Sequence, residues 1–220
     1  DTPRPGNAKF KKLTPVDPNS TNPYQLTEAD RTVIGNTTPK FSGGFGLNAT
    51  YKGFDMSMFF NFMYDFDVLN ANKIMLTTWA DNKENNFLMD IASDKRWRNF
   101  DDMGNEIRYS PEVLAEFNKN ATMWNPTSIG RPICMSYAVE DGSFLRLNSA
   151  TLGYTLPSVW TKKVGLSKVR FYVSGNNLFT LTGYSGYDPE VNIATGLTPN
   201  IDYNRYPRSR TYTFGAQLTF

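Results

Sequence analysis

A chain of 220 residues can form one large or two small domains. Its net charge of +2 is too small to favour nucleic acid as a partner, and the complete lack of His removes the commonest general base and metal ligand. The single Cys134 can form no disulfide within the chain, and no apolar run reaches the roughly 18–20 residues of a transmembrane helix.

Residues 1–39 are polar and irregular, and six prolines interrupt any long element. Residues 27–30 (TEAD) can form one capped helical turn. The chain starts at Asp1 without an initiator Met or a signal peptide, so we expect a mature product or a fragment of a longer protein.

Residues 40–51 and 54–64 alternate from one side chain to the next, which is the period of a strand. Lys52 and Gly53 between them predict a tight turn. Each segment has about eleven residues, close to the 9–11 of a tilted transmembrane strand, whereas strands of soluble proteins have about five or six. One predicted face carries Phe41, Gly43, Phe45, Leu47, Ala49, Tyr51, Phe54, Met56, Met58, Phe60, Phe62 and Tyr64.

Residues 65–142 show no alternation and are rich in Asn, Asp, Lys and Arg. Ser110 followed by Pro111 predicts the start of a short helix over residues 112–117. A structureless loop of this length is unexpected in a compact soluble domain, but it is ordinary on the outer side of a large membrane barrel.

Strand patterns return at residues 143–156 and 169–181. In the first of them the apolar residues change phase near Asn148 and Ser149, which predicts a β-bulge. Pro157 ends this strand, and residues 158–164 predict a short helix closed by Gly165. A second long loop covers residues 182–208. The last strand, residues 209–220, alternates up to a final aromatic.

The connections between the five predicted strands are alternately short and long, which is typical of an outer-membrane barrel with short periplasmic turns and long extracellular loops. Five strands cannot close such a barrel, because the smallest have about eight strands and lipid tolerates no open edge. We therefore predict an all-β fold, a transmembrane antiparallel β-barrel of which this chain forms the C-terminal strands. Residues 1–39, 65–142 and 182–208 are then extracellular.

Six segments follow one another along residues 30–220: DRTVIGN with PKF (30–41), VEDGSFLRLN (139–148), LGYTLP (152–157), VSGNNLF (173–179), YSGYDPE (184–190) and YNRYP (203–207). Together they resemble recurrent segments of the SusC/RagA-type TonB-dependent outer-membrane transporters. The resemblance implies a barrel of about 22 strands with an N-terminal plug, in an outer membrane of Bacteroidetes type. It also implies import of oligosaccharides or peptides.

The same resemblance implies partners. A SusD-like surface lipoprotein would cover the barrel as a lid, and TonB would supply energy through an N-terminal region that this chain lacks. The remainder of the same transporter would supply the plug and the upstream strands. Many relatives carry an acidic, Gly-containing stretch before the DRTVIGN segment. Residues 13–24 here lack the dense carboxylates and Gly of a calcium loop, so we expect no metal.

Candidate cargo-binding residues lie in the two long loops. Aromatic rings there can stack on sugars or pack peptide side chains, but they can equally pack the loops together or contact the lid. Charged residues can line the cargo path or form solvated ion pairs. The candidates are Trp79, Trp97, Trp124, Tyr184, Tyr187, Asp188, Glu190 and Arg205, and the last loop also holds Asp202 and Arg208. Inside the barrel, cargo or plug could contact Asp55, Asn61, Arg170 and Asn176.

The last strand has two compatible interpretations. Its apolar residues Tyr212, Phe214, Leu218 and Phe220 are expected to face lipid, and they resemble the C-terminal signal read by the outer-membrane assembly machinery. A periplasmic aromatic girdle is expected at Tyr51, Phe54, Tyr154 and Phe220.

Catalysis has little support, since the sequence offers no convincing nucleophile–base pair, no GxSxG, no phosphate-binding loop and no singled-out carboxylate pair. We expect no enzyme, no catalytic residue and no cofactor. Two alternatives to an importer stay open: a passive outer-membrane porin or adhesin-like barrel, and a soluble carbohydrate-binding sandwich.

Overall fold

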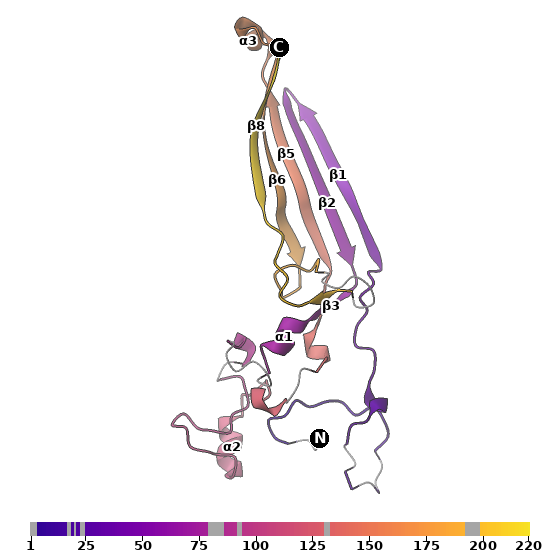
Figure 1. Cartoon of the computed structure of the whole chain (residues 1–220), viewed down its shortest axis with the longest axis vertical. Helices are drawn as coiled ribbons and strands as arrows, with labels where there is room; N and C mark the ends of the chain where they lie inside the picture. Colours follow the sequence, from indigo (N-terminus) through magenta and orange to yellow (C-terminus); the bar gives the residue numbers. More distant parts are fainter. Residues whose placement is uncertain are drawn as a thin grey trace. The chain divides into compact units, whose positions relative to one another are not determined.

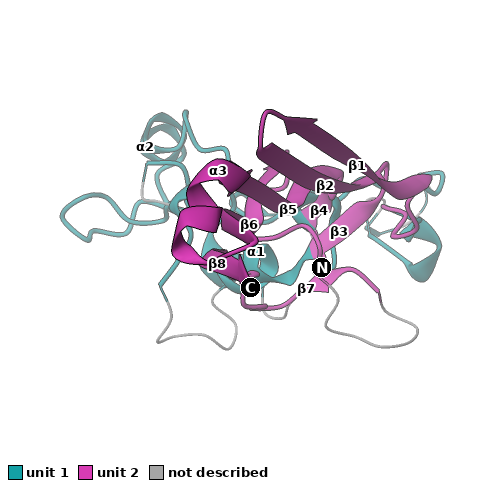
Figure 2. Cartoon of the chain, turned by 90° about the horizontal axis from the view of Figure 1, so that it is seen from above, with its two compact units in different colours: residues 1–34, 70–138 teal, residues 35–69, 139–220 magenta. Residues whose placement is uncertain are grey.

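The computed structural model (Figure 1) describes residues 4–16, 19, 21–22, 25–78, 86–91, 94–129, 133–191 and 199–220. Trp79 lies outside the described residues. The chain divides into two compact units (Figure 2). One consists of residues 1–34 and 70–138, and the other of residues 35–69 and 139–220.

The second unit is built on a five-stranded sheet with the order β1-β2-β5-β6-β8, in which every neighbouring pair is antiparallel. Its strands are β1 (Phe41–Tyr51), β2 (Phe54–Tyr64), β5 (Phe144–Thr155), β6 (Lys168–Thr182) and β8 (Thr211–Thr219). A smaller sheet has the order β4-β3-β7 and consists of β3 (Asp67–Asn70), β4 (Val139–Asp141) and β7 (Ile201–Asp202). The long predicted loops therefore contain three short strands that the sequence analysis does not expect.

The register of the five strands places the apolar side chains on one surface, here called the apolar face. Residues directly opposite each other in neighbouring strands share a face. One such row is Tyr51, Phe54, Tyr154 and Phe171, and another is Phe45, Phe60, Leu147 and Phe179. Aromatic pairs lie within each row: the rings of Phe45 and Phe60 stack with centroids 4.9 Å apart.

The bulge expected near Asn148 is present. Ser149 pairs with Phe59 and Leu147 pairs with Phe60, so Asn148 has no partner in the register with β2. One extra residue shifts the alternation by one. As a result the apolar residues on both sides of the bulge remain on the apolar face although their spacing in the sequence changes phase.

The opposite surface of the sheet, here called the polar face, carries mainly polar residues and glycines. Two aromatic side chains lie flat over glycines on neighbouring strands. A Cβ at Gly215 would lie 2.3 Å from Tyr172, and a Cβ at Gly44 would lie 2.8 Å from Phe59. Such contacts cover strand glycines and help to fix the register.

Both short connections of the sheet lie at one end, together with the C-terminus (Figure 1). Lys52 and Gly53 have φ angles of +45° and +89°, as a two-residue type I′ hairpin turn requires. Between β5 and β6, helix α3 (Ser158–Thr161) continues into the 3-10 turn η5 (Lys162–Val164), and both end at Gly165 in the left-handed conformation.

The other end of the sheet carries the core of this unit. Phe66, Val68, Phe144, Tyr184 and Val191 form one buried cluster, with Met63 packed against it. Phe144 and Met63 are opposite each other in the register and lie on the polar face, so the cluster covers the polar face at this end. The long connection after β6 is thereby folded onto the sheet.

The first unit consists of short helical elements joined by irregular chain. They are η1 (Glu28–Asp30), α1 (Ala71–Met75), η2 (Met89–Ile91), α2 (Pro111–Phe117), η3 (Pro126–Ser128) and η4 (Ser136–Ala138). Pro111 occupies the first turn of α2 as predicted, but the side chain of Ser110 makes no capping hydrogen bond. Buried apolar residues of this unit are Ile74, Ile91, Ile107, Ile129, Met135 and Ala138.

None of the helices in the described ranges is long and apolar enough to cross a membrane.

Candidate functional site

The connection between β6 and β8 is held against the sheet by an ion network. Arg146 lies on the polar face of β5, and its side chain is only 2% exposed. It forms an ion pair with Asp188 at 2.5 Å, and Glu190 lies 3.8 Å away. Glu190 also pairs with Arg208 at 2.6 Å, so one buried cation and one partly exposed cation hold two carboxylates of the YSGYDPE segment.

The pKa of Asp188 reflects opposing influences. Burial by itself raises the pKa of this carboxyl, but hydrogen bonds from Arg146 and from the backbone N–H of Glu190 leave it below its usual value. Asp188 is therefore charged at neutral pH, as its position beside the buried guanidinium requires.

Tyr184 anchors the start of the same connection. It is buried in the apolar cluster, and its hydroxyl donates a hydrogen bond of 2.7 Å to Asp202 on β7. Burial, followed by the nearby carboxylate, raises the pKa of Tyr184 above the usual tyrosine value. Next to it, Ser185 donates from both its backbone N–H and its hydroxyl to Glu140 on β4, at 3.0 and 2.9 Å. The ring of Tyr184 is thus covered in this structure.

Tyr187 lies in the chain between Tyr184 and Asp188, but unlike them its side chain is exposed. It is 87% exposed, although the chain is fixed on one side at Tyr184 and on the other at Asp188. Because the loop is fixed on both sides of Tyr187, this exposed ring can stack on a ligand without a large loss of chain entropy on binding. Arg205, further along the connection, is also exposed.

Trp97 and Trp124 lie in the other unit, where they pack its interior. Trp124 is partly buried, donates from its indole to the carbonyl of Thr77 at 3.2 Å and meets Tyr137 edge-on at 5.1 Å. Trp97 is partly buried against Gly6, since a Cβ on that glycine would lie 2.4 Å from its ring. Both rings have the surroundings of packing residues.

Of the four residues expected inside the barrel, two form an ion pair across three strands. Arg170 on β6 reaches over Gly153 on β5 to Asp55 on β2, with one hydrogen bond of 2.9 Å from Nε and a second from Nη2. A Cβ at Gly153 would lie 2.4 Å from the guanidinium, so the glycine makes this crossing possible. Asn61 and Asn176 lie on the same polar face by register.

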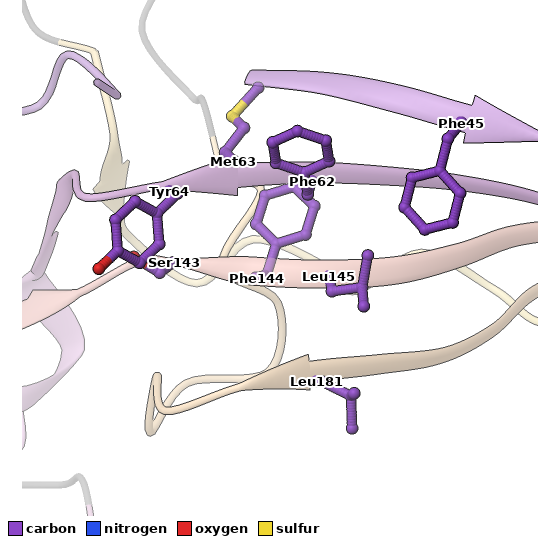
Figure 3. Close-up of a pocket in the computed structure, with 8 residues that line it drawn as sticks. All are labelled: Phe45, Phe62, Met63, Tyr64, Ser143, Phe144, Leu145 and Leu181. Carbon is purple, nitrogen blue, oxygen red and sulfur yellow. The ribbon is translucent and has the colours of Figure 1, made fainter. Parts of the chain in front are cut away.

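A shallow hollow of about 420 Å³ opens on the apolar face (Figure 3). Its lining residues are Phe45, Phe62, Met63, Tyr64, Ser143, Phe144, Leu145 and Leu181. None of these eight described residues is charged, so the hollow offers few groups that could orient a polar cargo. Five of its lining residues lie on the apolar face of β1, β2, β5 and β6, whereas Met63 and Phe144 belong to the polar face by register, and none of the eight belongs to the ion network around Arg146.

Metal binding is not supported by the described side chains, which contain no group of three or more His, Cys, Asp or Glu placed to hold an ion. Asp30, at the start of the DRTVIGN segment, accepts hydrogen bonds from backbone groups. It accepts hydrogen bonds from the N–H groups of Leu13, Thr14 and Thr27 at 2.8–2.9 Å, with Lys12 at 3.6 Å. These hydrogen bonds, led by the one from the Thr14 N–H, lower the pKa of Asp30.

The structure thus brings Tyr184, Asp188 and Glu190 together on one pinned loop, with Tyr187 displayed between them. Sequence analysis does not single out Arg146, which holds them. The available signal is a lone Arg at a polar-face position between two leucines in FLRLN.

The curated proteins that this chain resembles in sequence are TonB-dependent receptors. No family model matches the chain. TonB-dependent receptor P3 of Formosa agariphila is 35% identical over 202 residues, which are 89% of this chain and 18% of that protein. TonB-dependent receptor SusC of Bacteroides thetaiotaomicron is 38% identical over 88 residues, which are 38% of this chain and 8% of that protein.

Solved structures agree with the sequence relatives. The RagAB peptide transporter matches with a TM-score of 0.64 and 27% identity, covering 83% of this chain and 17% of that one. The RagAB peptide importer in its closed-closed state matches with a TM-score of 0.66 and 26% identity over 89% of this chain and 19% of the other. The chain spans less than a fifth of the length of these relatives.

Proposed function

Since this chain is a homologue of the SusC/RagA-type TonB-dependent receptors, we propose that it forms the C-terminal strands of an outer-membrane importer. The importer takes up oligosaccharides or peptides, and its barrel has about 22 strands, of which this chain supplies five. A SusD-like lipoprotein serves as its lid, and TonB acts through a plug encoded upstream.

The observation that carries this proposal is the five-stranded sheet with one continuous apolar face and two open edges. The apolar rows run across all strands from β1 to β8, and within the described chain neither β1 nor β8 has a second strand partner. In lipid each backbone polar group needs a partner, so both edges require strands from elsewhere. A larger barrel supplies them, with the apolar face toward lipid and the polar face toward the lumen.

In this arrangement the long connections lie on the extracellular side and contact the cargo and the lid. Tyr187 and Arg205 are exposed and are the candidates in the last loop for direct contact. Asp188 and Glu190 hold the loop through Arg146 and shape the lumen entrance. Of the tryptophans, Trp97 and Trp124 contribute by packing the large loop, and Trp79 remains a candidate outside the described residues.

Uptake by intact cells tests this function. Cells with and without the complete receptor are given pools of peptides and of oligosaccharides, and depletion of the medium is followed by mass spectrometry. If the receptor is an importer, cells that contain it deplete either the peptides or the oligosaccharides faster than the deletion strain does, and a protonophore abolishes this difference. Depletion that persists with the protonophore would favour the passive porin, and the absence of any difference would leave an adhesin.

A further inference from the structure

The connection between β5 and β6, residues 156–167, exposes large apolar side chains on a short turn. Val159, Trp160 and Val164 are 69%, 60% and 71% exposed. Scattered single apolar residues are ordinary on protein surfaces, but three within six residues form a patch. The turn lies at the end of the sheet that carries the hairpin turn and the C-terminus (Figure 1).

The exposure of this patch is fixed by the structure of the turn. Thr161 is only 2% exposed, and its backbone carbonyl accepts a hydrogen bond of 3.1 Å from Leu166 N–H. Gly165, with φ of +75°, closes the turn, and Leu156 N–H donates to the carbonyl of Val169. The buried threonine points inward while its neighbours Trp160 and Lys162 point outward.

The same turn is basic. Lys162 and Lys163 are exposed, as is Lys168 directly after the turn, and none of the three has an ion pair within the described part of the chain. The sequence contains no Asp or Glu between residues 142 and 187. Asp55 is the one Asp or Glu in the five strands of the sheet; Arg170 forms an ion pair with it, and Lys168 also attracts it. The turn itself is therefore positively charged and contains no Asp or Glu.

The turn that carries the patch lies at the end of the sheet where the apolar face also ends (Figure 1). The row formed by Tyr51, Phe54, Tyr154 and Phe171 ends the apolar face on this side. Phe220 is 90% exposed, and its backbone carbonyl accepts a hydrogen bond of 3.3 Å from Ser167, which ties the end of the chain to the turn. Aromatic rings followed by lysines at the end of an apolar span are the pattern of a membrane–water interface.

We propose that the turn of residues 156–167 is a membrane-interface anchor that binds anionic phospholipid headgroups. Val159, Trp160 and Val164 insert at the acyl boundary, and Lys162 and Lys163 contact lipid phosphates. Each lysine close to an anionic surface favours binding roughly fivefold. The anchor rests on the proposed function, because it requires the apolar face of the sheet to lie in a bilayer.

Quenching of tryptophan fluorescence tests the anchor in the intact receptor. The receptor is placed in phosphatidylcholine nanodiscs that contain a minority of phosphatidylglycerol brominated near the headgroup, or the same minority of brominated phosphatidylcholine. We expect stronger quenching by the anionic lipid. W160F removes the quenched component, whereas the matched W124F variant, altered in the large loop, retains it. K162Q/K163Q reduces the preference for the anionic lipid at least fivefold while quenching by brominated phosphatidylcholine remains.

One further variant separates the anchor from its premise. F214W in the W160F background places a reporter on the apolar face of β8. If the reporter at position 214 is quenched but wild type and W160F are quenched to the same extent, the membrane barrel stands and the anchor is overturned. A protein partner that covers Trp160 would give this result. Quenching of Trp160 without any preference for the anionic lipid would overturn the headgroup site. An unquenched reporter at position 214 would overturn the membrane barrel itself.

Discussion

Arg146 is the single residue on which the geometry of the last loop depends most. It is buried, charged and paired with a carboxylate from a segment more than forty residues away in the sequence. A buried guanidinium is tolerated only with such partners, so the loop and the strand require each other. No local pattern reveals this pair, because a strand residue and a loop residue meet only after the chain has folded.

Replacing this guanidinium should release the loop. R146M leaves Asp188 and Glu190 without their buried cation, and loss of one partner of a buried pair costs about 3–5 kcal/mol. Trypsin cleavage at Arg205 and Arg208, in outer membranes that contain the intact receptor, should become at least about 100-fold faster. K40M removes the exposed pair with Asp65 and should leave this cleavage unchanged. Equal rates of trypsin cleavage in R146M and wild type would show that the ion pair of Arg146 with Asp188 does not hold the loop.

The ionisation of Asp188 gives the same loop a defined dependence on pH. Because the pKa of Asp188 is lower in the folded state, its contribution is present above the ordinary carboxyl pKa and is lost as pH falls through the lowered value. Hydrogen exchange of residues 183–191, corrected for intrinsic rates, should show constant protection from about pH 8 to pH 5 and a loss only below about pH 4. Release of the loop between pH 5 and 7 would show that another group controls it.

Gly142 in the VEDGSFLRLN segment packs against the buried cluster with no room for a larger side chain. A Cβ there would lie 2.5 Å from Phe66 and 2.6 Å from Val68 in the buried cluster. G142A should therefore destabilise the cluster by about 1–3 kcal/mol through overpacking. Hydrogen exchange at Tyr184 and its neighbours should become about 5- to 150-fold faster. The matched variant is G183A, where nothing lies within 4 Å, and its exchange should equal that of wild type. Similar behaviour of the two variants would refute this packing argument.

At the scale of elements, alternation over about eleven residues locates the strands well. Sequence analysis predicts strands at residues 54–64 and 143–156, and the structure has β2 at Phe54–Tyr64 and β5 at Phe144–Thr155. The turn chemistry of Lys52–Gly53 and Gly165 was readable because a left-handed φ restricts the residue type. The strands β3, β4 and β7 were not predictable, since two to four residues carry no period and depend on partners distant in the chain.

The alternation of β8 leads to a prediction about assembly. Phe220 directly follows β8 and is 90% exposed. F220D puts a charge where lipid or the assembly machinery is expected, so the amount of heat-modifiable barrel in the outer membrane should fall several-fold while transcript levels stay constant. M103D changes an equally exposed residue of the large loop and serves as the control. Normal barrel levels in F220D would argue against a role of Phe220 in assembly.

At the scale of the whole molecule, the five strands are one part of a structure that must close elsewhere. Both edges of the sheet are open within the described chain, and the relatives are about five times as long as this chain. The sequence predicted the sheet and its apolar face because both follow from local alternation. It did not predict that residues 1–34 and 70–138 form one compact unit, because that grouping depends on contacts between irregular segments with no common pattern.

We propose that this chain works as a barrel segment of a TonB-dependent importer. A native pull-down of the chain from detergent-solubilised outer membrane, with mass spectrometry of everything retained, tests it most directly. The account predicts recovery of a longer polypeptide that carries an N-terminal plug, together with a SusD-like lipoprotein. Recovery of the chain alone, or only of additional barrel strands without plug or lid, would contradict it.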